Sequence, residues 1–495
     1  ALATPKFKTD PFSLGVASGD PAQDGFVIWT RLAPLPLEVG GGMPRRPVDV
    51  TWEIASDETM SRRVAGGAAT ARPDLSHAVH VEIGGLEPGR EYFYRFEVGG
   101  IRSQIGRAKT MPLPGREGAI RFGSAGCQRY EDGLFTAWRH IAEERFDFVV
   151  HYGDYIYEYK AIDAVSSRER PVVRVMPGNP SKCLTLDDFR NRYAIYKLDK
   201  DLQAAHASAP FLMSFDDHEV ENDWAGFVSE NKTVTPKAFA LRRAAAFQAW
   251  YEHMPLRRQQ MPVGPDVLAY RRLDVGRLLR LDVLDTRQYR SDQPCGGGWQ
   301  ACAEAKAAQR TMLGKVQEDW LYAGFKASEV QWNVVAQQVP VARFNRSGDP
   351  SIIETHMDKW DGAEAARERL FAAATGAKLK NIVALAGDVH HNRASEFKRD
   401  FDNTASPSIG VEFVATSISS GGDGKNRLAQ TPKMTAANPH LKFYNDQRGY
   451  VRHTVTTTSW QADYRVIGTV STPNAAVSTA ALFVVENGSG RLARG

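Results

Sequence analysis

The sequence predicts an α/β protein in two parts, with an immunoglobulin- or fibronectin-like β-sandwich at the N-terminus and a larger α/β domain behind it. Short strand-like runs separated by Gly/Pro turns fill the first 112 residues without a long helical period. Beyond a Pro- and Gly-rich segment at 111–118, apolar runs alternate with helix-period segments. We therefore expect domains over residues 1–112 and 113–495.

Four runs indicate the strands of the sandwich. They are FVIWTRL at 26–32, VDVTWEIAS at 48–56, HAVHVEI at 77–83 and EYFYRFEVGG at 91–100. The segment LEPGREYFYRF resembles the corner of fibronectin type III and immunoglobulin-like domains, where a tyrosine follows a Leu-x-Pro-Gly turn. No reactive side chains converge here, so a structural role is the better interpretation of this part.

The second part contains short apolar runs that indicate buried strands, with helical segments between several of them. The strand candidates are AIRFGSAG, FDFVV, FLMSF, RLLRLDVLD, WNVVA, NIVALA and GVEFVAT. A helix is expected in GLFTAWRHIAEERF at 133–146, where apolar residues share one face. A second helix is expected in TLDDFRNRYAIYKL, which opens with Thr185 and Asp188 at capping-box spacing.

Composition places the chain among ordinary globular proteins and excludes several partner classes. Hydrophobic residues make up 42% of the 495 residues, enough for a sizeable core. The 62 basic and 58 acidic residues leave a net charge of +4, which is too balanced to predict a nucleic-acid or membrane partner. No apolar run approaches the length of a membrane span. We expect a monomer.

The N-terminus and the cysteines bear on the cellular compartment. The opening ALATPKFKTDPF lacks the charged and apolar regions of a signal peptide, so it is either an intracellular start or the remainder after cleavage. Cys295 and Cys302 bracket a glycine-rich loop and could close a local disulfide. Cys127 and Cys183 stand apart from that pair.

Four of the predicted strands run directly into polar residues. The runs ending at 126, 152, 215 and 386 lead to Cys127-Gln128, Gly153-Asp154, Asp216-Asp217-His218-Glu219 and Gly387-Asp388-Val389-His390-His391. Because ligands of open α/β sheets bind beyond the carboxyl ends of the strands, these side chains are expected to gather in one place. Thiolate, phenolate and imidazole are soft metal ligands, whereas carboxylates are hard ones.

Each of these strand ends also has a structural interpretation. Asp154 could cap the segment that follows it, the acids at 216–219 could form the first turn of a helix, and Cys127 could be a small buried apolar residue. Recurrence at four strand ends favours a functional site. Burying clustered carboxylates without cations would raise their pKa values, and a centre of two or more metal ions removes that cost.

The motifs taken together resemble the PhoD-type alkaline phosphatases, within the calcineurin-like metallophosphoesterases. The resemblance covers nearly the whole chain and rests on PFSLGVASGDP, FGSAGCQ, GDYIYEY, SFDDHEVEND, LDTRQYR and ALAGDVHH, in that order. It implies a β-sandwich followed by a four-layer αββα metallophosphoesterase domain. It also implies an Fe(III)–Ca²⁺ centre with a second Ca²⁺ nearby, and a secreted, periplasmic or otherwise extracellular enzyme.

The resemblance assigns metal ligands residue by residue. Purple acid phosphatases, which are relatives, use a Gly-Asp-x-x-Tyr motif that here gives Asp154 as the bridge between two metals and Tyr157 as an iron ligand. The superfamily's GHxH motif corresponds to GDVH, which places Asp388 on calcium and His390 on iron. Cys127, at the first strand end, is assigned to iron as in PhoD-type enzymes.

The remaining assignments concern catalysis and substrate. The superfamily's GNHE motif corresponds to residues 216–219, so the resemblance puts Asp217 on calcium and makes His218 the residue that stabilises the transition state or protonates the leaving group. Asn222 is expected to offer calcium a further oxygen. Arg129 and Arg287 are candidate phosphate contacts, with a structural role as the open alternative for each.

The function implied is hydrolysis of phosphate esters by a metal-bound hydroxide, on small-molecule or lipid substrates. Phosphomonoesters and phosphodiesters both remain open, because relatives with phospholipase D-type activity share these motifs. Two other functions are possible from the sequence. One is a calcium-dependent binding protein, which the poor calcium ligands Cys127, Tyr157 and His390 disfavour. The other is a metallohydrolase that acts on non-phosphate esters.

Overall fold

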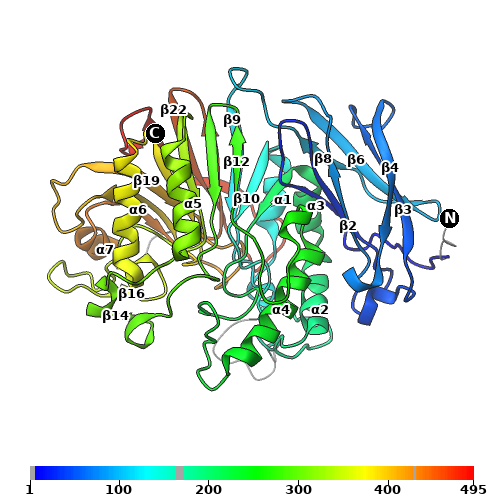
Figure 1. Ribbon diagram of the computed structural model, residues 1–495, viewed down its shortest axis with the longest axis horizontal. Helices are drawn as coiled ribbons and strands as arrows, with labels where there is room; N and C mark the ends of the chain where they lie inside the picture. Colours follow the sequence, from blue (N-terminus) through cyan, green and yellow to red (C-terminus); the bar gives the residue numbers. More distant parts are fainter. Residues whose placement is uncertain (1–5, 163–171, 427–430) are drawn as a thin grey trace.

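The computed structural model of the chain describes residues 6–162, 172–426 and 431–495. Two large mixed sheets lie face to face, and helices cover the outer face of each (Figure 1). This is the four-layer αββα arrangement expected for the second part of the chain. A smaller sheet, built from N-terminal strands, packs at one end of the molecule (Figure 1).

The first large sheet has ten strands. Its order is β24 (Ala493–Arg494), β23 (Val477–Glu486), β22 (Ser459–Ile467), β21 (Gly449–Val455), β9 (Ile120–Ala125), β10 (Phe148–His151), β11 (Pro210–Met213), β1 (Val16–Gly19), β2 (Phe26–Arg31) and β5 (Ala78–Ile83). The central strands β9, β10 and β11 run parallel, with Phe148 opposite Phe122 and Val149 opposite Phe211. Their carboxyl ends therefore meet at one edge of the sheet.

The facing sheet has seven strands. Its order is β12 (Arg271–Val275), β13 (Leu279–Val283), β15 (Trp332–Ala336), β17 (Ile382–Ala386), β19 (Ser408–Val414), β18 (Asn392–Lys398) and β20 (Leu441–Asn445). A parallel core runs through β13, β15, β17 and β19. Apolar side chains such as Phe122, Leu281 and Phe413 are fully buried between the two sheets.

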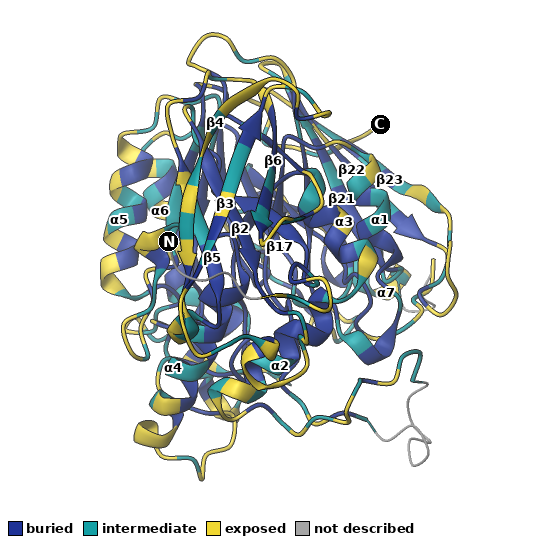
Figure 2. Cartoon of the chain, turned by 90° about the vertical axis from the view of Figure 1, so that its right-hand side faces the viewer, coloured by how far each residue is buried: buried dark blue, intermediate teal, exposed yellow. Residues whose placement is uncertain are grey.

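Helices close the two outer faces. Trp138 of α1 (Thr136–Glu143), Phe189 of α2 (Leu186–Lys197), Leu202 of α3 (Lys200–Ser208) and Phe247 of α4 (Pro236–His253) join the core on the ten-stranded sheet. Leu321 of α5 (Gly314–Lys326) and Leu370 of α6 (Glu364–Gly376) pack on the seven-stranded sheet. The outward faces of α5 and α6 are exposed, as Figure 2 shows. The short helix α7 (Thr431–Ala437) precedes β20.

The N-terminal strands form a sandwich that shares a sheet with the rest of the molecule. One layer is a five-stranded sheet made of β4 (Arg63–Ala71), β3 (Val48–Ala55), β6 (Glu91–Val98), β7 (Ile101–Arg102) and β8 (Gly106–Lys109). The other layer is the β1–β2–β5 end of the ten-stranded sheet, where Gly19 pairs with Phe211. The expected sandwich is thus present but continuous with the larger domain through β1, a four-residue strand too short to stand out in the sequence. The boundary at residue 112 stays a prediction.

Several local expectations are confirmed. The thirteen segments expected as strands or helices by their patterns coincide with elements of the structure. Helix α2 begins with the expected capping box, in which the Asp188 amide donates to Thr185 Oγ1 at 3.3 Å. Cys295 and Cys302 form a disulfide with an S–S distance of 2.04 Å, closing a loop that contains β14 (Trp299–Gln300), which pairs with β16 (Thr355–His356). Among the described helices, none combines the length and apolar character needed to cross a bilayer.

Candidate metal centre

The polar loops after β9, β10, β11 and β17 come together at one end of the two large sheets. The Cys127 amide donates to Gly153 O at 3.1 Å, which joins the first two loops. Glu219, fully buried, joins the second to the third by accepting from the backbone amides of Asp154, Tyr155 and Asp216 at 3.1, 2.6 and 2.9 Å. The four strand ends expected to converge do converge.

The close approach of two of these loops requires a glycine at position 153. Its φ is +125°, and a Cβ atom there would lie only 2.4 Å from the Asp216 backbone nitrogen. The approach of the two loops therefore leaves no room for a side chain.

Four predicted metal ligands have left-handed backbone conformations. The φ angles of Cys127, Asp154, Asp388 and His390 are +53°, +56°, +66° and +56°. Such a conformation costs a non-glycine residue about 1–2 kcal/mol. Strained residues of this kind cluster at functional sites, where the surrounding structure holds them in place. Their convergence here supports a functional reason for the strain.

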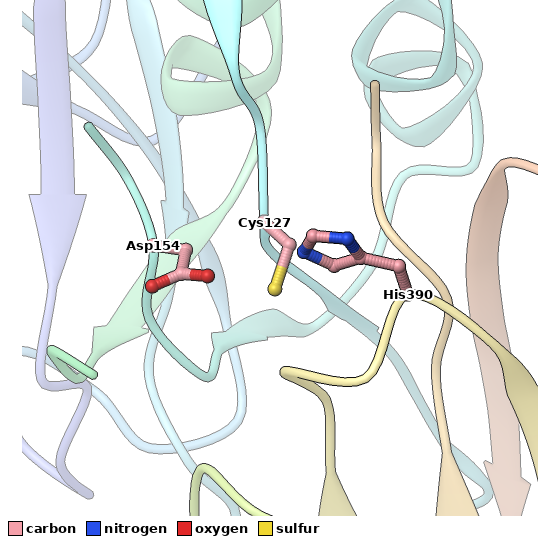
Figure 3. Close-up of side chains that lie close together, drawn as sticks. All are labelled: Cys127, Asp154 and His390. Carbon is pink, nitrogen blue, oxygen red and sulfur yellow. The ribbon is translucent and has the colours of Figure 1, made fainter. Parts of the chain in front are cut away.

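The first group of possible metal ligands contains the softer donors. Ligand atoms of Cys127, Asp154 and His390 lie within 4.8 Å of one another, and the three side chains approach one another from separate segments (Figure 3). Tyr157 Oη donates to Asp154 Oδ2 at 2.9 Å and lies 3.2 Å from His390 Nε2. We call Cys127, Tyr157 and His390 the cysteine side of the centre.

The second group consists of carboxylates. Ligand atoms of Asp216, Asp217 and Asp388 lie within 4.8 Å of one another, and we call these three residues the acidic side. Asp154, Asp217 and His218 form another group at the same spacing. Asp154 thus neighbours both sides, which is the position that a bridging carboxylate requires.

A third group, absent from the sequence prediction, adjoins the acidic side. It consists of Asp217, Asp223 and Asp358, with ligand atoms within 4.8 Å of one another. Asn222, the predicted calcium ligand, directs its side-chain amide to Glu230 Oε1 at 2.7 Å. Its role at the metal centre stays a prediction, while its neighbour Asp223 joins the group.

The electrostatics of the centre favour a bound cation. Burial raises the pKa values of Asp154 and Asp216 far above the ordinary carboxyl range, and the surrounding acids raise them further. Burial likewise raises the pKa values of the Cys127 thiol and the Tyr157 phenol, so neither ionises in the metal-free protein. A metal ion reverses this balance, because its charge stabilises every anionic ligand at once. The donor set therefore fits a metal centre.

Two cations, one buried and one partly buried, balance part of the acidic side. Arg287 has no exposed surface, and its guanidinium donates to Asp216 Oδ1 at 2.6 Å and Asp358 Oδ1 at 2.9 Å. Lys359 Nζ contacts the carboxylates of Asp388 and Asp358. Arg287 was a candidate phosphate contact with a structural role as the open alternative, and its complete burial among carboxylates favours the structural role.

His218 is oriented by a carboxylate that the sequence prediction left unassigned. His218 Nδ1 lies 2.8 Å from Glu158 Oε2, and Glu158 is fully buried. Burial alone would lower the pKa of His218, but Asp217, Asp154 and Glu158 together raise it well above its usual range. Because Nδ1 is engaged, Nε2 is the ring nitrogen available to a substrate.

Arg129 lies at the rim of the centre, on the side of the tyrosines. Its guanidinium is 6.0 Å from the Tyr157 ring centroid and 5.2 Å from that of Tyr159, while Glu131 Oε2 is 3.7 Å from its Nε. Tyr159 also packs edge-on against the His218 ring at 5.2 Å. The role of Arg129 as a phosphate contact stays a prediction.

Two residues next to predicted ligands, Tyr155 in GDYIYEY and His391 in GDVHH, lie outside the centre. Tyr155 Oη lies 2.9 Å from His206 Nε2 within the core. His391, next to the predicted ligand His390, stacks on Tyr444 and has its pKa lowered to about 3 by burial. Tyr155 and Tyr157 therefore have separate surroundings, and Tyr157 is the one beside Asp154 and His390.

Sequence reasoning missed the residues that support the ligands. Glu219 and Glu158 lie inside recognised motifs, so their buried carboxylates could have been flagged from position alone. Asp223 lies four residues beyond Glu219, and its burial, together with the nearby carboxylate of Asp358, raises its pKa to about 8. Asp358 follows no predicted strand, and only the tertiary fold brings it to Arg287.

Comparison with known proteins places this geometry in a family. The PhoD-like phosphatase family model matches residues 122–464, and the model of the PhoD-like phosphatase N-terminal domain matches residues 1–112. Alkaline phosphatase D of Bacillus subtilis (strain 168) is 48% identical over 486 residues, covering 98% of this chain and 82% of that protein.

Solved structures agree with the family match. A structure of PhoD superposes with a TM-score of 0.95 at 47% identity, covering 99% of this chain and 93% of that one. Purple acid phosphatase PPD1 from yellow lupin (Lupinus luteus) shares the fold, with a TM-score of 0.56 at 13% identity over 95% of this chain and 74% of its own. The chain therefore belongs to the PhoD-like phosphatase family.

Proposed function

We propose that this protein hydrolyses phosphate esters at a centre of one Fe³⁺ and two Ca²⁺ ions. The observation that supports it most directly is the position of Asp154, between a group of softer donors and a group of carboxylates. Family membership and the similarity to an alkaline phosphatase point to the same chemistry. This proposal also accounts for the mixed donor set, which a calcium-dependent binding protein would not need.

Each ion has a natural place among the donors. The cysteine side, with Asp154, would hold iron, because thiolate, phenolate and imidazole suit it. Asp217, which lies close to Asp154 in one group and to Asp388 in another, would hold one calcium together with those two carboxylates. The group of Asp217, Asp223 and Asp358 would hold the second, because calcium prefers carboxylate oxygens. When bound, the metals supply an acidified water as nucleophile and positive charge for the phosphoryl oxygens.

The residues of this chain position the substrate and move a proton. Arg129 would bind a phosphoryl oxygen, because a guanidinium matches phosphate in charge and geometry. His218 would donate a proton from Nε2 to the leaving oxygen, with Glu158 fixing the ring through Nδ1. Arg287 would hold the carboxylate of Asp216 in place, and Lys359 that of Asp388, through their ion pairs.

The cellular location is also a proposal. The Cys295–Cys302 disulfide fits an oxidising compartment, as expected for a secreted or periplasmic enzyme.

Parallel assays on the purified protein test the proposal. We expect turnover of p-nitrophenyl phosphate, bis-p-nitrophenyl phosphate or both, no turnover of p-nitrophenyl acetate at the same site, and loss of activity after chelation. The ratio of monoester to diester turnover decides between phosphatase and phospholipase D-type preference. Turnover of the carboxylic ester alone, or of no ester at all, would contradict the proposal.

A further inference from the structure

Buried hydroxyl side chains follow β19 and lie against the cysteine side of the centre. Thr416 Oγ1 donates to the backbone carbonyl of His390 at 3.1 Å, and Ser419 Oγ donates to that of Arg129 at 2.8 Å. Ser419 and Ser420 are 0% and 1% exposed. This segment therefore contacts the loops that present the softer ligands.

Ser420 is the residue of this segment that reaches a predicted ligand side chain directly. Its Oγ lies 2.8 Å from Tyr157 Oη and 2.7 Å from the carbonyl oxygen of Cys127. The same oxygen accepts a hydrogen bond from the Arg129 amide at 2.8 Å. A hydroxyl has one proton, so it can donate to only one of the two acceptors at a time.

The hydrogen bonds of Tyr157 leave its oxygen open to the Ser420 proton. Tyr157 Oη donates its own proton to Asp154 Oδ2 at 2.9 Å, so towards Ser420 it can only accept. A tyrosine oxygen that binds a metal would be a stronger, charge-assisted acceptor in the same position. The Cys127 carbonyl also accepts a hydrogen bond from the Ser420 amide at 3.3 Å. It therefore keeps one donor when the Ser420 hydroxyl donates to Tyr157 instead.

We propose that Ser420 is a positioning residue that donates a hydrogen bond to the ionised oxygen of Tyr157 and thereby tunes the iron site. The inference rests on the proposed iron site of the preceding section. The Arg129 amide strengthens the bond, because it donates to the same Ser420 oxygen and polarises the hydroxyl. Ser420 thus links the loop of a candidate phosphate contact to an iron ligand.

The visible spectrum of the iron-loaded protein reports on this hydrogen bond. A donor on the phenolate oxygen lowers the energy of its lone pairs, so removing the donor brings the tyrosinate-to-iron transition to lower energy. We expect the charge-transfer band of Ser420→Ala to move to longer wavelength and the reduction potential of the iron to become more negative. Ser420→Thr keeps the hydroxyl and should restore the wild-type band.

Ser419→Ala is the matched control, because Ser419 is equally buried and bonds to the same loop without touching Tyr157. Its band should stay at the wild-type position. A band in Ser420→Ala that does not move, with iron content equal to wild type, would overturn the inference while leaving the iron site intact. A wild-type protein without iron and without the band would overturn the proposed iron site and this inference with it.

A measurement on the unmodified protein covers the case in which Ser420→Ala does not fold. The resonance Raman bands of an iron-bound tyrosinate shift on transfer to D₂O when an exchangeable proton bonds to its oxygen. We expect such a shift in the wild-type protein. Identical bands in H₂O and D₂O after full exchange through unfolding and refolding would overturn the inference.

Discussion

The cysteine side and the acidic side of the centre differ in how cations contact them. On the cysteine side, the Ser420 hydroxyl lies at Tyr157 Oη, while the cation Arg448 and the Thr416 hydroxyl both donate to the backbone carbonyl of His390. On the acidic side, the buried Arg287 bonds to the carboxylate of Asp216 and the partly buried Lys359 to that of Asp388. Cations therefore pair directly with the carboxylates, whereas on the cysteine side Arg448 contacts the backbone and Arg129 lies over the Tyr157 ring.

Replacing Asp154, the proposed bridging ligand, should disrupt metal binding on the cysteine side and on the acidic side together. Asp154→Asn keeps the shape of the side chain but removes the charge that both metals would share. We expect activity to fall to background, with loss of iron and of calcium measured by elemental analysis. Near-normal kinetics in this variant would refute the bridging role, and Glu82→Gln, far from the centre on β5, controls for a generic loss of one carboxylate.

Selective chelation should separate the two sides. EGTA is expected to remove calcium and the activity but to leave the colour, and added Ca²⁺ should restore turnover. A strong iron chelator should remove both colour and activity, and Ca²⁺ alone should not restore them. Full activity after EGTA treatment, with calcium absent by elemental analysis, would show that the acidic side needs no calcium.

The proton donor should matter less than the metals. His218→Asn is expected to lower kcat by about 10²–10⁴-fold, the usual contribution of a general acid. Metal content should stay at the wild-type level, and leaving groups of low pKa should lose less activity because they need less protonation. His140→Asn, at a partly buried histidine of α1 that contacts the Ala475 carbonyl outside the centre, serves as a control and should keep the wild-type kcat. An equal loss for all leaving groups would argue against proton donation by His218.

Substitutions of the tyrosines in GDYIYEY should differ in their effect on the visible absorption band and should leave the fold intact. Tyr157→Phe removes the ligand oxygen and is expected to abolish the visible band while sparing the calcium content. Tyr155→Phe removes a hydroxyl that faces His206 and should leave the band unchanged. If both variants keep the band, the iron ligand on this loop is not a tyrosine.

The smallest expected effect is a pH dependence of the stability of the metal-free protein. The pKa of Asp223 is raised to about 8, against an ordinary value of about 4. The folded state then binds its proton more tightly than the unfolded state, so the free energy of unfolding falls as pH rises through this window. Thermal melts of the metal-free protein should follow that trend, and Asp223→Asn should make it shallower without removing it, because the raised pKa values of Asp154 and Asp216 act in the same direction. Stability that instead rises from pH 4 to 8 in the metal-free protein would contradict the assignment.

Much of the fold and the convergence of the polar strand ends could be predicted because strands and strand ends are local features. Apolar runs followed by Cys127, Asp154 or Asp388 indicate both the strand and the polar residue that ends it. The shared sheet could not be predicted, because β1 is four residues long and pairs with β11 nearly 200 residues away. Asp358 was missed for the same reason: it reaches the centre through tertiary contacts with Arg287. The sequence left Arg287 between a phosphate contact and a structural role, because a sequence does not reveal its burial.

Metal analysis combined with a visible spectrum tests the central claim most directly. The purified, active protein should contain one iron per chain together with calcium, and it should absorb visible light through a tyrosinate- or thiolate-to-iron transition. Loss of the iron should remove the colour and the phosphate-ester hydrolysis together. A colourless, iron-free preparation with full activity would contradict the account.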